Sequence, residues 1–156
     1  MPSIRIRPAR SGDWLQLEKL VAGIAEFHGE SHKLTRARFD ELACGANPFV
    51  LVLVAETEDG TLAGYAAGFP IFEFHNGRSG FQVDNLYVCD NFRRERVGES
   101  LMLFLIQAAQ EKYQSERFKL GAKEWNNAAI CFYKQMGFEE NPQSSESVIL
   151  RREFAR

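Results

Sequence analysis

The feature that most constrains this sequence is a change of pattern near residue 90. Before it, three apolar runs are joined by the dipeptides Asp59-Gly60 and Asn76-Gly77, which are typical of β-hairpin turns. The runs span residues 49–55, 61–72 and 81–88. After it, a helical pattern over 97–113 separates the last of these runs from another strand-like segment, and such a crossover favours parallel pairing. We therefore expect an antiparallel meander that continues into an α/β layer.

The flanking segments extend this scheme at both ends. Helices are predicted over 14–27, 35–44 and 126–136, and further strands over 3–7, 118–122 and 148–154. Gly137 follows the last helix in a position typical of a C-cap. The predicted fold class is α/β (α+β): a mixed, mostly antiparallel sheet of about six or seven strands flanked by helices on both faces.

Composition limits the function classes. The 156 residues fit one domain over 1–156. Lys plus Arg is 19 and Asp plus Glu is 21, so the chain lacks the basic excess of a general nucleic-acid binder. No apolar run is long enough for a membrane span, and no secretory leader is visible. Cys44, Cys89 and Cys131 have no metal-ligand spacing, which favours free thiols in the cytoplasm. We expect no metal, nucleic-acid or membrane partner.

A basic turn precedes the helix predicted over 97–113. Arg93, Arg94 and Arg96 stand at its start, where the helix dipole already carries a partial positive charge. This arrangement is unfavourable unless an anion, most readily a phosphate or pyrophosphate, occupies the site. Gly98 would allow the backbone to approach that anion closely. The alternative interpretation is a solvated charged loop, partly neutralised by its own Glu residues.

A second motif lies in the segment 124–138. Asn126 offers an N-cap, and Tyr133 shares one helical stripe with Ala129 and Met136. The residue pattern alone is compatible with a core aromatic at Tyr133 or with a catalytic phenol.

Together these segments resemble the GNAT family of N-acetyltransferases, in particular the spermidine/spermine and thialysine acetyltransferase-type enzymes that act on small amines. The resemblance rests on Leu86-Tyr87-Val88, on Arg93-x-x-x-x-Gly98, and on Trp125-Asn126 through Phe132-Tyr133 to Gly137-Phe138. It implies splayed central strands, acetyl-CoA as cosubstrate, no metal, and a homodimer.

The resemblance also implies catalytic roles for Tyr133 and Asp84. Tyr133 matches the general acid that protonates the departing thiolate. Asp84 matches an acidic position that serves as base or amine anchor, and its short side chain suggests a water relay. Strand period two predicts that Val83 and Asn85 face away from Asp84.

Cofactor contacts are implied along three segments of the chain. These residues are Leu86, Tyr87, Val88, Arg93, Arg94, Arg96, Val97, Gly98, Glu99, Ser100, Asn126, Ala129 and Phe132. Arg96 stands where the family pattern has Gly, and we expect it to keep a negative φ. Backbone N–H groups would then do most of the binding.

The acceptor site is predicted from two segments of the chain. Phe27, His28, Glu30, Phe72 and Glu73 are predicted to bind the acceptor, with Phe74 and Phe81 nearby. Phe39, Phe49, Phe104 and Phe118 are predicted core residues. The predicted function is transfer of an acetyl group from acetyl-CoA to a primary amine of a small molecule by direct attack in a ternary complex. The alternatives are a protein or peptide acetyltransferase, acting on lysine or the N-terminus, and a non-catalytic CoA-binding regulatory module.

Overall fold

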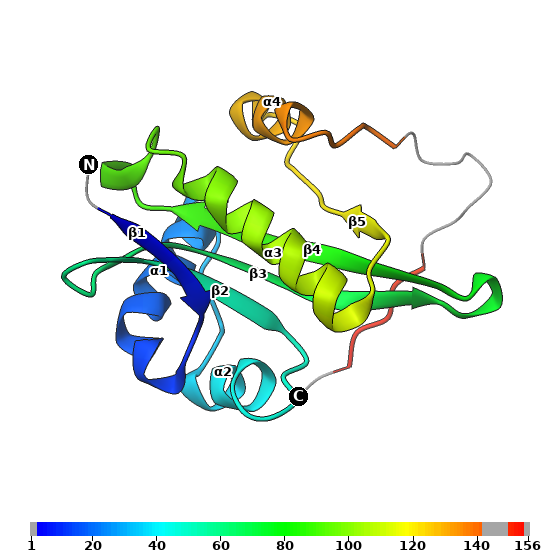
Figure 1. Cartoon of the computed structure of the whole chain (residues 1–156), viewed down its shortest axis with the longest axis horizontal. Helices are drawn as coiled ribbons and strands as arrows, with labels where there is room; N and C mark the ends of the chain where they lie inside the picture. The colour runs from blue at the N-terminus through cyan, green and yellow to red at the C-terminus, as the bar shows by residue number, and fades with distance from the viewer. Residues whose placement is uncertain (1–2, 142–149, 155–156) are drawn as a thin grey trace. The chain divides into compact units, whose positions relative to one another are not determined.

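The computed structural model describes residues 3–141 and 150–154 (Figure 1). The elements are β1 (Ile4–Pro8), α1 (Trp14–Phe27), α2 (Arg36–Ala43), β2 (Leu51–Thr57), β3 (Leu62–Glu73), β4 (Arg78–Val88), α3 (Val97–Tyr113), β5 (Arg117–Lys119) and α4 (Asn127–Gln135). They form two compact units, Met1–Gly121 and Ala122–Arg156, each described here by itself. A single functional domain over 1–156 stays a prediction.

The sheet of the first unit confirms the predicted topology. Its order is β1-β2-β3-β4-β5, with antiparallel pairing between the first four strands and parallel pairing of β4 with β5. The described residues form five strands rather than six or seven. Residues 150–154 of the predicted last strand are not in a strand, and 148–149 lie outside the described residues. The alternating pattern of these residues is typical of a strand, but a strand also needs a hydrogen-bonded neighbour, which the pattern does not provide.

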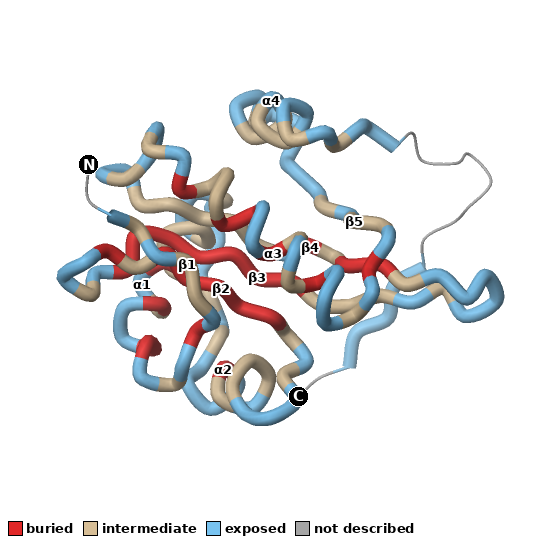
Figure 2. The backbone as a smooth tube through the Cα atoms, in the orientation of Figure 1, coloured by how far each residue is buried: buried red, intermediate tan, exposed pale blue. Residues whose placement is uncertain are grey.

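Helices cover both faces of this sheet, as predicted. One face packs on α1 and α2 through a buried cluster that includes Trp14, Leu17, Phe39, Val54 and Tyr65. On the other face α3 contributes Leu101, Met102 and Leu105, each fully buried. The buried residues run along β2, β3 and β4 (Figure 2). These three strands are apolar on both sides because both of their faces are covered.

An ion-pair cluster ties β1 to the start of α1 and to β2. Both terminal nitrogens of the Arg7 guanidinium donate to the Asp13 carboxylate at 2.8 Å, and its Nε donates to Glu56 at 2.9 Å. Asp13 also accepts from the backbone N–H of Arg10 at 2.7 Å. Hydrogen bonds from Arg7 hold the pKa of Asp13 below its ordinary value. Asp13 therefore anchors the Arg7 side chain and also accepts from the backbone at the start of this helical segment.

The phenylalanines divide differently from the sequence prediction. Phe39 is a core residue, but Phe49 and Phe104 are 60% and 50% exposed. Phe49 precedes β2, and Phe104 lies on the solvent stripe of α3, so neither faces an apolar layer. Phe81, expected near the acceptor, is fully buried against Tyr113 and Phe118. The apolar character of a residue does not by itself reveal which side of a helix or strand is covered.

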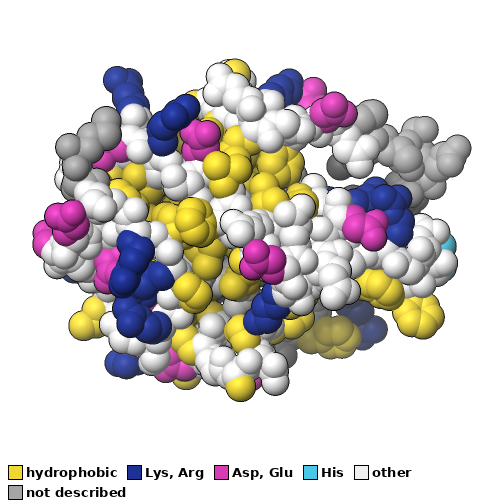
Figure 3. All heavy atoms as spheres, in the orientation of Figure 1, with side chains coloured by type: hydrophobic (Ala, Val, Ile, Leu, Met, Phe, Trp, Pro, Cys, Tyr) yellow, Lys and Arg dark blue, Asp and Glu magenta, His cyan; other side chains and the backbone are white. Residues whose placement is uncertain are grey.

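Basic and acidic side chains are mixed over the face shown in Figure 3, in keeping with a net charge of -2. Among the described residues, no helix is long and apolar enough to cross a membrane. The same residues bring together no group of His, Cys, Asp or Glu suited to holding a metal ion.

Candidate active site

At the edge of the sheet, β5 runs parallel to β4 but pairs with only part of its length. β5 pairs with β4 only from Gly80 to Gln82. Between Val83 and Val88, β4 keeps its antiparallel partner β3 but has no strand partner on the side of β5 in the described part of this unit. The carbonyl groups of Val83, Asp84 and Val88 already accept hydrogen bonds from the side chains of Gln82, Asn85 and Arg93. The remaining backbone N–H and C=O groups on that edge are available to an extended ligand.

A β-bulge at Asp84 lies at the start of this open edge. Val83 is opposite Gly68 and Asn85 is opposite Ala67, so Asp84 has no partner in the register. The extra residue reverses which face of the sheet the side chains after it occupy. Val83 therefore faces the α3 side, with Phe81, whereas Asn85 meets Tyr65 in the α1 cluster. The prediction that Val83 and Asn85 share one face was wrong, because strict alternation does not survive a bulge.

Gly68 makes room for this bulge. A Cβ at this position would lie 2.5 Å from the carbonyl oxygen of Gln82 and closer still to the Phe81 ring. Both obstacles are fixed, one as backbone and the other as a fully buried side chain. The absence of a side chain at position 68 is thus a requirement of the β3–β4 pair.

The Asp84 carboxyl group has few polar neighbours. The residue remains exposed to solvent, and no side chain in the described ranges donates a hydrogen bond to its carboxylate. Partial desolvation raises the pKa of Asp84 above its ordinary value. Because it favours the protonated acid, this environment makes the ionised carboxylate a stronger base.

The turn that links β4 to α3 is conformationally strained. Arg94 and Arg96 have φ values of +69° and +62°. A left-handed conformation at a non-Gly residue costs roughly 1–2 kcal/mol. The expectation of a negative φ at Arg96 was wrong: the arginine adopts the conformation that glycine has in such a turn. Strain of this kind is concentrated at ligand-binding sites.

Arg96 offers a direct test of this strain. Arg96→Gly is expected to be more stable than Arg96→Ala by about 1 kcal/mol, because only glycine relaxes at this φ. Both variants lose the same side chain and its 3.2 Å ion pair with Glu99, so the comparison isolates the backbone. Chemical denaturation of the pair gives the difference, and equal stabilities would show that the turn is unstrained.

The N-terminus of α3 opens onto the same turn. No side chain caps it, and Arg96 is its N-cap residue. Its first N–H groups, from Val97 to Glu99, have no helical acceptor, which is the usual basis of an anion site. Ser100 already donates its backbone N–H to Arg96. The backbone of this turn thus fits the predicted pyrophosphate loop.

The Arg93 side chain is occupied within the protein. Its Nε donates to the carbonyl of Val88 at 3.0 Å, its Nη1 lies 2.8 Å from the Asp90 carboxylate, and its guanidinium lies over the Tyr87 ring. Arg93 therefore shapes the turn. Arg94 and Arg96 are exposed like Arg93, and Arg96 forms a 3.2 Å ion pair with Glu99.

In the second unit, α4 holds the predicted phenol in an aromatic setting. The Asn126 side chain caps the helix by accepting from Ala129 N–H at 3.2 Å. The Tyr133 ring packs edge-on against Phe132 and Phe138, and burial raises the pKa of its hydroxyl. Gly137, with φ of +91°, ends the helix as predicted.

The predicted acceptor residues do not form one cluster. Phe27, His28 and Glu30 lie at the end of α1. Phe72 and Glu73 lie near the tip of the β3–β4 hairpin, about 13 Å along the strand from Gly68. Glu73 also pairs with Arg117 at 2.6 Å, so its charge is already compensated. The chain order of strand residues did not reveal this separation.

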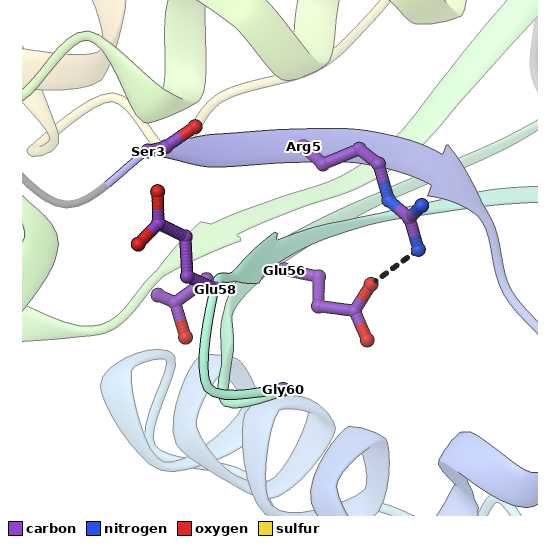
Figure 4. A pocket seen from close by; sticks show the side chains of 6 residues that line it. Ser3, Arg5, Glu56, Glu58 and Gly60 are labelled. Carbon is purple, nitrogen blue, oxygen red and sulfur yellow. Dashed lines mark hydrogen bonds and ion pairs between the residues drawn. The ribbon is translucent and has the colours of Figure 1, made fainter.

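A pocket of about 430 Å³ lies elsewhere, at β1 and the turn after β2 (Figure 4). It is lined by Ser3, Arg5, Glu56, Thr57, Glu58 and Gly60. Arg5 and Glu56 neutralise each other across 2.9 Å. The pocket contains none of the predicted site residues.

Tyr65, Gly68 and Asn85 surround the bulge, and the residue pattern indicated no role for them at the site. Gly68 carried a usable signal, since glycine inside a strand often marks a bulge. Tyr65 and Asn85 are adjacent only through strand register, which the sequence does not specify.

A mostly antiparallel sheet with helices on both faces defines an α/β fold, and the family match identifies the chain as an acyltransferase enzyme. The chain belongs to the acetyltransferase (GNAT) family, which matches it over residues 14–138. Thialysine N-epsilon-acetyltransferase of Mus musculus is 28% identical over 153 residues, covering 92% of this chain and 89% of the relative. The Sus scrofa enzyme of the same name is 26% identical over 146 residues, covering 88% and 85%.

Solved structures share this fold. An aminoglycoside acetyltransferase from an uncultured soil metagenomic sample, in complex with sisomicin, has a TM-score of 0.72 at 19% identity and covers 98% of this chain and 97% of its own. A ribosomal-protein-alanine N-acetyltransferase from Brucella melitensis has a TM-score of 0.73 at 20% identity, covering 96% and 100%. At such identities the likeness establishes the fold alone.

Proposed function

We propose that this acetyltransferase moves the acetyl group of acetyl-CoA to a primary amine of a small molecule by direct attack. The observation that carries the proposal is the open edge of β4 from Val83 to Val88, which leads to the uncapped N-terminus of α3. An extended, amide-containing arm ending in a pyrophosphate matches these two features in order. The similarity to thialysine N-epsilon-acetyltransferases supports a small amine as acceptor.

The residues present fit this cosubstrate. Backbone groups between Leu86 and Val88, other than the Val88 carbonyl that accepts from Arg93, would hold the pantetheine arm. The N–H groups of Val97, Gly98 and Glu99 would hold the pyrophosphate. The bound cosubstrate supplies an activated thioester. The exposed side chains of Arg94 and Arg96 add positive charge near the phosphates.

Asp84 has the role of proton acceptor in this proposal. An alkyl ammonium has a pKa of about 10.4, so at neutral pH it must lose a proton before it attacks. The Asp84 carboxylate receives that proton, through water where its short side chain does not reach. Tyr133 donates a hydrogen bond to the departing sulfur.

Asp84→Asn is expected to lower kcat roughly 10²–10⁴-fold, the usual contribution of a general base. The amide matches the carboxyl group in shape but cannot accept the proton. The KM for acetyl-CoA is expected to stay close to that of the unmodified enzyme. The measurement is initial rate against pH, and an unchanged kcat would exclude Asp84 as the base.

Acetyl-CoA turnover across thialysine, polyamines, aminoglycosides and lysine peptides tests the function as a whole. Preference for a small amine supports the proposal, whereas preference for peptides favours a protein acetyltransferase. CoA binding without turnover on any acceptor favours a regulatory module. Thermal stability that does not change at saturating CoA would contradict the cosubstrate site itself.

A homodimer, expected from the resemblance, and a cytoplasmic location, expected from the free thiols, remain part of this proposal. Sedimentation at micromolar concentration tests the oligomeric state.

A further inference from the structure

Tyr65 and Asn85, which have no role in the proposed mechanism, form hydrogen bonds next to the bulge. The Tyr65 hydroxyl donates to Oδ1 of Asn85 at 2.7 Å, and Nδ2 of Asn85 donates to the main-chain carbonyl of Asp84 at 2.6 Å. Tyr65 is 2% exposed and belongs to the core cluster under α1. A continuous chain of hydrogen bonds therefore runs from the rigid core to the backbone of Asp84.

The chain of hydrogen bonds has only one satisfactory orientation. If the Asn85 amide were turned over, its oxygen would face the Asp84 carbonyl oxygen and one hydrogen bond would be lost. The contact with the Asp84 carbonyl therefore requires Nδ2 on that side and Oδ1 toward Tyr65. The Tyr65 hydroxyl then donates its hydrogen to Asn85, and the Asn85 amide donates to the main-chain carbonyl of Asp84.

Few other charged groups surround Asp84. Tyr65 on β3 is its titratable neighbour across the sheet; burial raises the pKa of Tyr65, and the negative charge of Asp84 raises it further. On β4 itself the next titratable group is Tyr87, whose pKa is raised mainly by burial and only slightly by Glu26 of α1. On β5, Lys119 lies opposite Gln82, before the bulge.

We propose that Tyr65 and Asn85 are positioning residues that fix the bulge and keep the Asn85 amide away from the Asp84 carboxylate. The inference rests on the proposed role of Asp84 as base. Without the Tyr65 hydroxyl, the Asp84 carbonyl alone holds the Asn85 amide, which then turns more readily toward the carboxylate. Donation to the carboxylate stabilises its charged form and weakens the base. The bulge also loses its connection to the core, so the carboxylate is less precisely placed.

Tyr65→Phe tests the proposal. We expect roughly 10- to 100-fold lower kcat, an unchanged KM for acetyl-CoA, and an acid limb of the rate profile displaced to lower pH. Carbon-13 NMR titration of the Asp84 carboxyl group in the free enzyme should show its pKa displaced in the same direction. Asn85→Leu removes the amide donor along with the link, so its kcat should fall without that displacement.

Tyr113→Phe is the matched control. Tyr113 is also an aromatic residue packed in the core, but its buried hydroxyl has no hydrogen-bond partner among the described residues. Its removal should leave the rate, the Asp84 titration and the KM unchanged. A Tyr65→Phe enzyme that loses stability but keeps the Asp84 titration unchanged would overturn the proposal.

The NMR readout separates this inference from the proposed function. If Asp84→Asn remains active while Tyr65→Phe still displaces the Asp84 titration, the positioning role stands and the assignment of Asp84 as base fails. If Asp84→Asn is inactive and the titration does not move in Tyr65→Phe, the base stands and the positioning role fails.

Discussion

Tyr133→Phe is expected to lower kcat roughly 10²–10⁴-fold while leaving the chain folded, since only one oxygen is removed. A thiolate of pKa about 8.5 does not take a proton readily from a phenol of pKa about 10. Burial raises the Tyr133 pKa further, so the hydroxyl stays protonated as a hydrogen-bond donor throughout the neutral range. The contribution is therefore large but incomplete.

Steady-state kinetics with acetyl-CoA and the preferred amine check this result. The ring contacts with Phe132 and Phe138 remain in the variant, so its stability should match that of the parent. The raised pKa also means that Tyr133 ionisation should not limit the rate near neutral pH. A kcat equal to that of the parent would remove Tyr133 from the mechanism and leave it a packing residue of α4.

Gly68→Ala is expected to have the largest effect on stability. Its methyl group would lie 2.5 Å from the Gln82 carbonyl oxygen and closer to the buried Phe81 ring, so the β3–β4 pair must separate. Overpacking of this kind costs about 1–3 kcal/mol, and more where backbone is the obstacle. For a chain of this size, each kcal/mol lowers Tm by roughly 2–4 °C.

Gly12→Ala provides the control for this substitution. A Cβ at Gly12 meets nothing within 4 Å, and its φ is not in the left-handed region. The Tm of the Gly12→Ala variant should stay within about 2 °C of the parent or rise slightly, because alanine restricts the conformations of the unfolded chain. Calorimetry of both variants makes the comparison. Equal stabilities would mean that the bulge tolerates a side chain at position 68.

Local patterns predicted most of the elements. Residues 97–113 were predicted as a helix and form α3 with the same bounds, because its apolar spacing and flanking turn act within one segment. The hairpin dipeptides likewise placed the turns between β2, β3 and β4. The basic turn was found because three arginines at a helix start conflict with local electrostatics.

Features that depend on neighbouring strands were not predictable in this way. The bulge at Asp84 exists because β3 and β4 shift register between Ala67 and Gly68. That shift reversed the expected faces of the residues around Asp84 and brought Asn85 to Tyr65. Phe49 was expected in the core and is exposed, whereas Phe81 was expected at the acceptor site and is buried. Burial depends on which helix covers each face of the sheet.

The sequence by itself determined the family, the order of the elements from β1 to α4 and the chemistry of the candidate residues, since these follow from short-range spacing and residue type. The tertiary structure decided the left-handed conformation of Arg96, the open edge of β4 and the hydrogen-bonded surroundings of Asp84. Each of these depends on how one strand meets another, or on how the chain leaves the sheet. Such long-range pairings have no counterpart in the local order of residues.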